Sequence, residues 1–257
     1  MELTLQAFLI ILPAVFLAGL VDSIAGGGGL LSVPAYMAAG LPPHYVLGNN
    51  KFSSSFGTLF ATLRYHQHGL VDVRVALLSA GFALIGSFLG TSAVLLLRPD
   101  FLRLLLIVLI PLVAVLTLTN RSLGRENYSH RQSRQRKYIL AALAALLIGF
   151  YDGFFGPGTG TFLILFYTLA LKYDFVTANA NTKVVNLASN IAAVVTFIAH
   201  DKVLFVIGIP AAAFGIAGNL LGARLVIRRG GSIIRPVFLF TLILLFAKVL
   251  YDLLTRG

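Results

Sequence analysis

The sequence contains no cysteine and has few charged residues. Without cysteine among its 257 residues, the chain has no disulfides, thiolate metal sites or thiol catalysis. Charged residues make up only 11% of the chain, whereas soluble domains carry about a quarter. Hydrophobic residues make up 58%, and the mean hydropathy is +0.91. These proportions predict an all-α integral membrane protein without a separate soluble domain.

Acidic residues are scarcer than basic ones, which gives a net charge of +11. The basic residues lie between apolar runs, an arrangement typical of cytoplasmic loops rather than of a nucleic-acid interface. No Lys or Arg precedes the first apolar run, which argues against a secretory signal. His66 and His68 have no acidic cluster beside them, and no nucleophile-and-base set is present. We therefore expect no metal site, no cofactor, no nucleic-acid partner and no enzyme activity.

Apolar runs long enough to cross a bilayer as helices follow one another along the chain. A first half, residues 1–118, and a second half, residues 138–257, flank a basic cytoplasmic linker, 119–137. The second and seventh runs are short and begin after glycines or a proline, so the count of transmembrane segments lies between about 8 and 10. The expected segments are 4–25, 30–42, 43–66, 73–97, 101–118, 138–155, 159–173, 175–199, 203–227 and 233–254.

The two halves resemble each other. Asp22 stands four residues before a run of four glycines, and Asp152 stands four residues before a second glycine-rich run. Lys51 matches Lys183 at an offset of 132 residues, and the same offset aligns His68 with His200. Self-similarity of this kind predicts two structural repeats. The glycines involved are Gly26, Gly27, Gly28, Gly29, Gly156, Gly158 and Gly160.

The distribution of Lys and Arg predicts that the repeats are inverted relative to each other. With five crossings in each half, thirteen basic residues lie on the cytoplasmic side and four outside, and both termini lie outside. If the second and seventh segments were re-entrant, the cluster at 224–235 would move outside. The four outside are Arg98, Arg103, Lys202 and Arg256.

The glycine runs are expected to break helices inside the membrane. Irregular backbone at this depth is tolerated where protein buries it or where it lines a wet cavity. A helix that starts after the break, at Leu30 or Thr161, presents free N–H groups that suit an anion. Paired interruptions in two repeats indicate the binding site of a transporter. The alternative is close helix packing through small residues.

Two polar stripes lie among the apolar residues, each headed by a lysine. A charge at mid-helix costs about 2.5–3.5 kcal/mol on insertion scales, so such a face is unsuited to lipid. We expect the stripes to form opposite walls of a substrate-binding cavity, although each lysine could instead extend to the membrane surface. Asp22 and Asp152 could pair with the lysines, hold the glycine loops or carry a coupling proton. The stripes, with their neighbours, comprise Asn49, Asn50, Lys51, Ser54, Thr58, Lys183, Asn186 and Asn190.

The chain resembles the TauE/SafE family of sulfite and organosulfonate exporters of bacterial inner membranes. Residues 21–31 with Pro34, the turn 48–51, residues 149–158, Lys183 and 186–190 carry the resemblance, which covers the whole chain as two family repeats. It departs from the family at Asn49, where Thr is frequent, and in the second copy, which has Asn181 and Thr182 there.

This resemblance implies a multi-pass transporter that exports a small sulfur-containing oxyanion across the inner (plasma) membrane. Its partners would be that anion and the lipid bilayer. Whether it forms a homo-oligomer is left open. Two alternatives also stay open. One is a proton-coupled carrier of a cation or neutral solute on the same scaffold, with the aspartates as ion ligands. The other is a membrane subunit that scaffolds a complex and transports nothing.

Overall fold

A computed structural model describes residues 5–96 and 124–256 of the chain. All regular structure in these ranges is helical, as predicted, and it comprises nine α-helices and a single 3-10 turn, η1 (Ser129–Arg131). The predicted segment at 101–118 lies outside the described residues. The helices are α1 (Leu5–Ala25), α2 (Gly29–Ala38), α3 (Pro43–Gln67), α4 (Val73–Leu96), α6 (Arg134–Phe154), α7 (Thr159–Ala170), α8 (Phe175–Ala199), α9 (Phe205–Arg229) and α10 (Gly231–Arg256).

Five of these helices are long and apolar enough to cross a membrane: α1, α4, α6, α8 and α9. The helix α3 is as long as α8, but it carries Lys51 and neighbouring polar residues. With 10 and 12 residues, α2 and α7 rise only about 15 and 18 Å. Each is shorter than the roughly 30 Å hydrocarbon core of a bilayer.

Helix boundaries recur along the chain. α3 begins at Pro43 and α8 begins at Phe175, 132 residues later, and both have 25 residues. α4 and α9 begin at Val73 and Phe205, again 132 residues apart. α1 and α6 both have 21 residues. The offset found between the lysines therefore also relates whole helices.

Some helix starts differ by a few residues from the predicted positions. α6 begins at Arg134, so the last four residues of the predicted linker 119–137 are helical. The hydroxyl of Ser133 accepts a hydrogen bond from the backbone N–H of Arg136 at 3.4 Å and caps this helix start. After the glycine runs, α2 begins at Gly29, one residue before the predicted segment 30–42. α7 begins at Thr159, as the predicted segment 159–173 does, and two residues before the expected helix start at Thr161.

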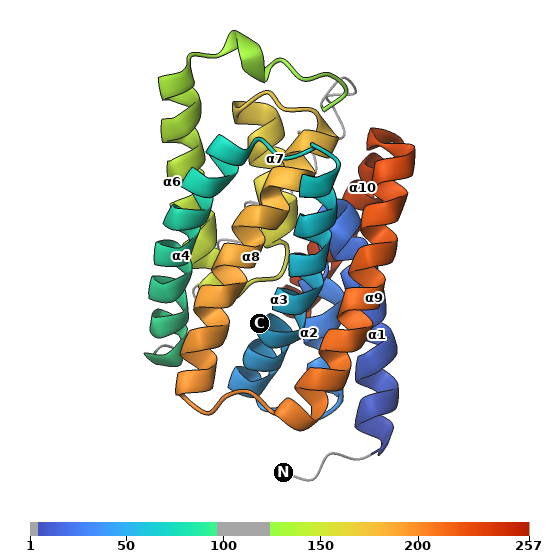
Figure 1. The fold of residues 1–257 in the computed structure, drawn as a ribbon. Helices are drawn as coiled ribbons and strands as arrows, with labels where there is room; N and C mark the ends of the chain where they lie inside the picture. Colours follow the sequence, from blue (N-terminus) through green and yellow to red (C-terminus); the bar gives the residue numbers. More distant parts are fainter. Residues whose placement is uncertain (1–4, 97–123, 257) are drawn as a thin grey trace.

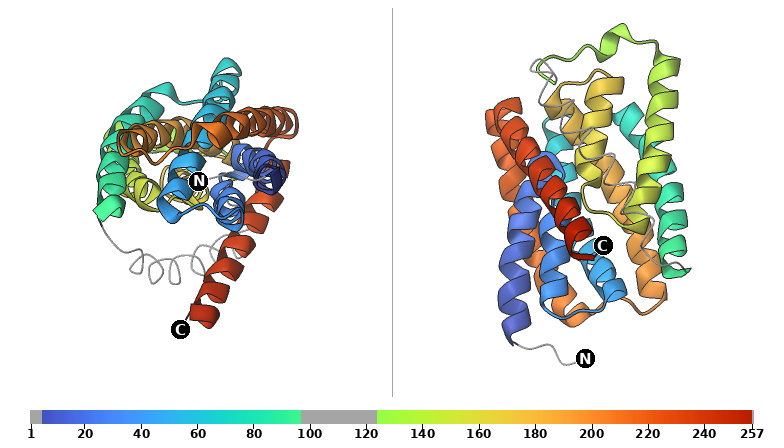
Figure 2. Two further views of the ribbon diagram at one scale, coloured as in Figure 1. Left: turned by 90° about the horizontal axis from the view of Figure 1, so that it is seen from below. Right: turned by 180° about the vertical axis from the view of Figure 1, so that it is seen from behind.

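Six helices form a row in the order α6, α4, α8, α3, α9, α1, which Figure 1 shows from left to right. The central pair, α3 and α8, runs in opposite directions. The short helices pack beside this row, α2 against α1 and α3, and α7 against α8 and α6. Seen from below in Figure 2, the C-terminal end of α10 diverges from the bundle.

Glycines allow the outer helices of the row to approach each other closely. A Cβ on Gly86 or Gly90 of α4 would collide with the backbone of α6. At the positions 132 residues later, Gly218 and Gly222 of α9 lie in the same way against the backbone of α1. Small residues at such crossings are typical of membrane helix packing, because they let backbones touch.

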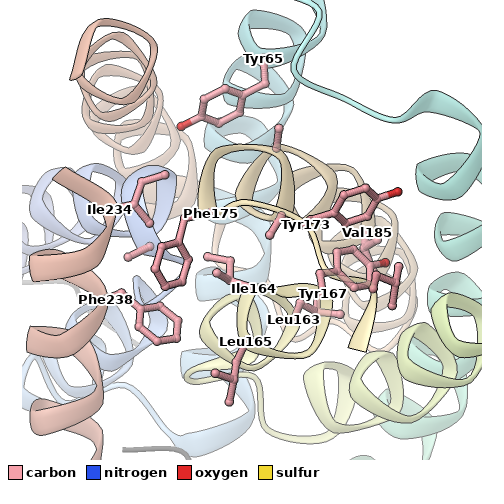
Figure 3. Close-up of a cluster of buried hydrophobic side chains, with 14 of the residues drawn as sticks. Tyr65, Leu163, Ile164, Leu165, Tyr167, Tyr173, Phe175, Val185, Ile234 and Phe238 are labelled. Carbon is pink, nitrogen blue, oxygen red and sulfur yellow. The ribbon is translucent and has the colours of Figure 1, made fainter. Parts of the chain in front are cut away.

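α7 lies inside the main hydrophobic cluster (Figure 3). Phe175 and Phe238 lie on one side of it with ring centroids 5.7 Å apart. Tyr167 and Tyr173 lie on the other side, 6.4 Å apart. Ile164 is fully buried between these two groups. α7 is apolar and most of its residues are buried, which matches a short core helix enclosed by longer ones.

Polar contacts join the loops at one end of the bundle. Oδ2 of Asp72, before α4, accepts hydrogen bonds from Lys137 Nζ at 3.1 Å and from the Tyr173 hydroxyl at 2.6 Å. Partial burial raises the pKa of the Asp72 carboxyl, but the hydrogen bonds from Tyr173 and Lys137 and the Lys137 charge lower this pKa below its usual value. The carboxylate thus ties α4 to α6 and to the loop before α8.

We expect Gly90→Ala to lower the midpoint of thermal unfolding in detergent, because overpacking a tight contact costs about 1–3 kcal/mol. Gly222→Ala should have a similar effect at the equivalent crossing. Gly81→Ala is the matched control on α4, because a Cβ there meets no atom within 4 Å. A decrease for Gly81→Ala as large as for Gly90→Ala would contradict the packing argument.

We expect Asp72→Asn to be destabilising by about 1–3 kcal/mol at neutral pH, because Lys137 loses a charged partner. Because the folded-state pKa of Asp72 is lowered, its contribution is present above the unfolded pKa of about 3.9 and is lost as pH falls through the folded pKa. Unfolding midpoints of parent and variant should therefore converge below about pH 4. Asp201→Asn, at an exposed aspartate in another loop, is the control. A gap between parent and variant that is independent of pH would contradict this assignment.

Candidate functional site

Two buried ion pairs connect the first half of the chain to the second. Lys51 Nζ of α3 lies 2.6 Å from Asp152 Oδ1 of α6. Lys183 Nζ of α8 lies 2.9 Å from Asp22 Oδ2 of α1. Each lysine therefore pairs with the aspartate of the other half, one of the three roles that the sequence left open for the aspartates.

Equivalent helices supply equivalent members of the two pairs. Each lysine is the ninth residue of a 25-residue helix, about one third of the way along it. Because α3 and α8 run in opposite directions, the two lysines enter the bundle from opposite ends. Each aspartate lies in the last turn of its helix, directly before a glycine break. The two pairs thus flank the middle of the bundle.

The Lys51–Asp152 pair is enclosed by protein. Both side chains are only 3% exposed. Lys51 Nζ also donates to Asn190 Oδ1 at 3.1 Å, and the hydroxyl of Ser189 donates to Asp152 Oδ2. The backbone carbonyl of Ser189 accepts from Ser87 Oγ on α4 at 2.6 Å. Both oxygens of Asp152 are therefore engaged, as a buried carboxylate requires.

The Lys183–Asp22 pair differs on its aspartate side. Lys183 is fully buried and also donates to the main-chain carbonyl of Asp22. The Asp22 side chain is 14% exposed and borders a cavity of about 10 Å³ between α1, α2, α3 and α9. Ser54, a predicted site residue, lines this cavity with Gly28, Ser32, Ser53 and Asn219. A cavity of this size holds about one water molecule.

The two glycine breaks cross each other at the middle of the bundle. Gly26 and Gly156 adopt left-handed backbone conformations, with φ of 76° and 95°. A Cβ on Gly160 would lie 2.5 Å from the Cα of Gly26, so only glycine permits this approach. The carbonyl of Gly26 accepts from the N–H of Thr161, at the start of α7, at 3.2 Å. The first glycine break thus caps α7, the helix that begins after the second break.

The remaining glycines of the predicted site also mark close contacts. Gly158 has a φ of 86° and directly precedes α7. A Cβ on Gly27 would meet Thr241 of α10, and one on Gly28 would meet Asp22. A Cβ on Gly29 would meet Pro157 of the second break at 3.2 Å. Small residues here let the two breaks and α10 come together.

Other predicted site residues lie apart from the lysine ammonium groups. Asn49 accepts from the N–H of Leu204 at 3.2 Å, just before α9, and donates to Tyr45 of its own helix. Asn50 accepts from the Ser32 hydroxyl at 2.6 Å and links α3 to α2. Thr58 is buried, and its hydroxyl has no hydrogen-bond partner among the described residues. Asn186 is buried on α8, one turn after Lys183.

Four residues that touch the ion pairs or the cavity were not predicted as site residues: Ser32, Ser53, Ser189 and Asn219. Asn219 carried a signal, because it is a lone amide in the apolar segment 203–227. A polar group at membrane depth is costly and therefore indicates function or a polar neighbour. Ser189 adjoins the predicted Asn190 and lies in the stretch 186–190 that carries the family resemblance. Within the ranges described, no three His, Asp or Glu side chains gather as metal ligands would.

Comparison with known proteins relates the chain to a transporter family. The family model described as sulfite exporter TauE/SafE matches residues 11–249. The probable membrane transporter protein YfcA of Escherichia coli K12 is 36% identical over 236 residues, covering 92% of this chain and 87% of that protein. A probable membrane transporter protein of Haemophilus influenzae is 32% identical over 252 residues, covering 98% of both chains.

A third relative, the probable membrane transporter protein ORF9 of a Sinorhizobium species, is 35% identical over 252 residues, covering 96% of this chain and 93% of that protein. No solved structure matches the chain. The family model and these relatives span nearly its whole length. The chain therefore belongs to the sulfite exporter TauE/SafE family, as a multi-pass membrane transporter rather than an enzyme.

Proposed function

We propose that the protein exports a small sulfur-containing oxyanion across the plasma membrane by alternating access between two inverted halves. The halves are residues 1–118 and 138–257, joined by a basic cytoplasmic linker, 119–137. The observation that carries this proposal is the exchange of partners in the ion pairs, in which each buried lysine of one half meets an aspartate of the other. Family membership supports transport, and the chemistry of the pairs supports an anion.

An ammonium group that holds a carboxylate can also hold a sulfite or sulfonate group. Both ligands present negatively charged oxygens that accept charge-assisted hydrogen bonds. In this structure Asp152 and Asp22 occupy the lysines, so the substrate would take the place of a carboxylate. Asn190, which already contacts Lys51, would then donate its amide to the substrate. On α3 and α8 the further donors would be Asn50, Ser54, Thr58 and Asn186.

The exchange of partners also supports alternating access. Each ion pair crosses from one half to the other, so releasing one pair while the other holds would let one half rock on the other. The recurring helix boundaries and the opposite directions of α3 and α8 favour an inverted repeat. Transporters with such repeats bind substrate near the bilayer midplane, at broken helices. The glycine breaks beside Asp22 and Asp152 fit this pattern.

Basic residues at one end of the bundle support access for an anion from the cytoplasm. Arg64, Arg74 and Lys172 are exposed at the end where α3 meets α4 and α7 meets α8. A cleft of about 430 Å³ at this end is lined by two arginines, Arg125 and Arg235, and by one acidic residue, Asp174, which caps the start of α8. A positive field concentrates anions at such a cleft, and the positive-inside tendency puts this end in the cytoplasm. Both chain termini would then lie outside.

Lys51→Ala and Lys183→Ala should each reduce the flux of sulfite or of an alkanesulfonate into proteoliposomes by about 10- to 100-fold. Losing a charge-assisted contact of about 1.5–3 kcal/mol accounts for this range. Lys202→Ala, which removes the same charge from the loop between α8 and α9 at the opposite end of the bundle, should leave the flux unchanged. Parental flux in both lysine variants would remove these lysines from the substrate site.

A paired variant separates the loss of substrate binding from the loss of folding. Lys183→Met alone leaves Asp22 as a partly buried carboxylate without its ion-pair partner, and such changes cost about 3–5 kcal/mol. Adding Asp22→Asn removes the charge and should restore much of the unfolding midpoint without restoring flux. Recovery of flux together with stability in the double variant would assign a purely structural role to Lys183.

A further inference from the structure

The cavity beside Asp22 borders the proposed substrate site, and it contains polar groups that anion binding does not explain. Lys183 does not line it, and it has room for about one water-sized group. Its polar lining comes from Asp22 of α1, Ser32 of α2, Ser53 and Ser54 of α3, and Asn219 of α9. Four helices from both halves therefore converge on it.

Two of the residues that line this cavity have oxygen atoms that accept no hydrogen bond among the described residues. Asn219 uses its amide N–H to donate to the Gly215 carbonyl at 3.0 Å, and its Oδ1 atom is buried with no partner among the described residues. Asp22 contacts Lys183 through Oδ2, which leaves Oδ1 available.

The hydroxyl protons of Ser32 and Ser53 are engaged elsewhere. Ser32 Oγ donates to Asn50 Oδ1 at 2.6 Å, and Ser53 Oγ donates to the Asn49 carbonyl at 3.0 Å. Ser53 Oγ then accepts from the Tyr36 hydroxyl at 3.2 Å, which leaves each serine oxygen at least one lone pair for a ligand. A pocket of acceptor oxygens with one carboxylate suits a hard cation and disfavours an anion.

The equivalent surroundings of Asp152 lack this character. At the offsets that align the halves, Ser32 corresponds to Phe162, Ser53 to Val185 and Asn219 to Ser87. Ser189 and Lys51 already engage the two oxygens of Asp152. The cavity is therefore not a simple consequence of the repeated fold.

We propose that this cavity binds one water-sized monovalent cation, Na⁺ or a hydronium ion, with Asp22 and Asn219 as its main ligands and the serine oxygens in support. The role of this cation in transport rests on the proposed function, whereas its binding does not. When Lys183 turns to a substrate anion, Asp22 is left without a partner, which is costly for a buried carboxylate. A cation in the cavity removes that cost, so the anion and the cation bind together. The net negative charge that crosses the membrane with the substrate is then smaller by one.

Other charged groups also act on Asp22. Lys183 of α8 contacts it directly, and Lys51 and Tyr65 of α3 and Asp152 of α6 interact with it electrostatically. Towards the cavity, α2 and α9 present only the uncharged Ser32 and Asn219. A cation response should therefore depend on Asn219 as well as on Asp22, which distinguishes the site from a general effect of charge.

The test measures thermal unfolding of the purified full-length protein in detergent, without sulfite or sulfonate. NaCl, KCl and choline chloride are compared at equal ionic strength and fixed pH, and pH is then varied in choline chloride. For a sodium site we expect the midpoint to rise saturably with Na⁺, and less with the larger K⁺. For a hydronium site we expect no response to Na⁺ and a midpoint that rises as pH falls.

Variants assign either response to the cavity. Asp22→Asn and Asn219→Leu should abolish it, and Asn219→Leu leaves the Lys183–Asp22 pair in place. Ser87→Ala, at the position equivalent to Asn219 in the other half, should retain it. If the midpoint responds to neither Na⁺ nor acid, or responds equally in Asn219→Leu, the cavity holds a neutral water and the proposal is overturned. A cation response without anion flux would instead refute the proposed function and leave this site standing.

Discussion

Two buried lysines paired with aspartates from the opposite half of the chain set the main constraint on this structure. An unpaired charge at membrane depth is costly, so neither half can bury its own lysine comfortably without the other. Pairing Lys51 with Asp152 and Lys183 with Asp22 makes each half complete the other. The helices α3 and α8, which carry these lysines, therefore occupy the centre of the row.

The glycines make this exchange of partners possible. Gly86 and Gly90 bring α4 against α6, and Gly218 and Gly222 bring α9 against α1, so that each outer pair also joins the two halves. At the breaks, the close approach of Gly26 to Gly160 lets the ends of α1 and α6 deliver their aspartates to the middle of the bundle. The close glycine contacts and the buried ion pairs therefore lie at the same interface, the one between the two halves.

Much of the helical layout could be predicted from the apolar runs, and the segment 175–199 matches α8 at both ends. The basic residues before 138 were assigned to the linker, although they form the first turn of α6 under the Ser133 cap. The repeat offset identified Lys51, Lys183, Asp22 and Asp152 as equivalent pairs. It left their partners open, because an offset relates positions without saying which of them touch. Ser32 and Ser189 become relevant only when helices from distant segments meet.

The most direct test of a substrate site shared by two halves uses the absence of cysteine from the chain. Ser54→Cys introduces a single thiol beside Asp22, and its labelling by an impermeant maleimide is measured from each face of oriented membrane vesicles. The account predicts that the maleimide labels this thiol from either face, because the site opens to one face at a time. An alkanesulfonate should slow the labelling. Labelling from one face only, at a rate that the sulfonate does not change, would contradict it.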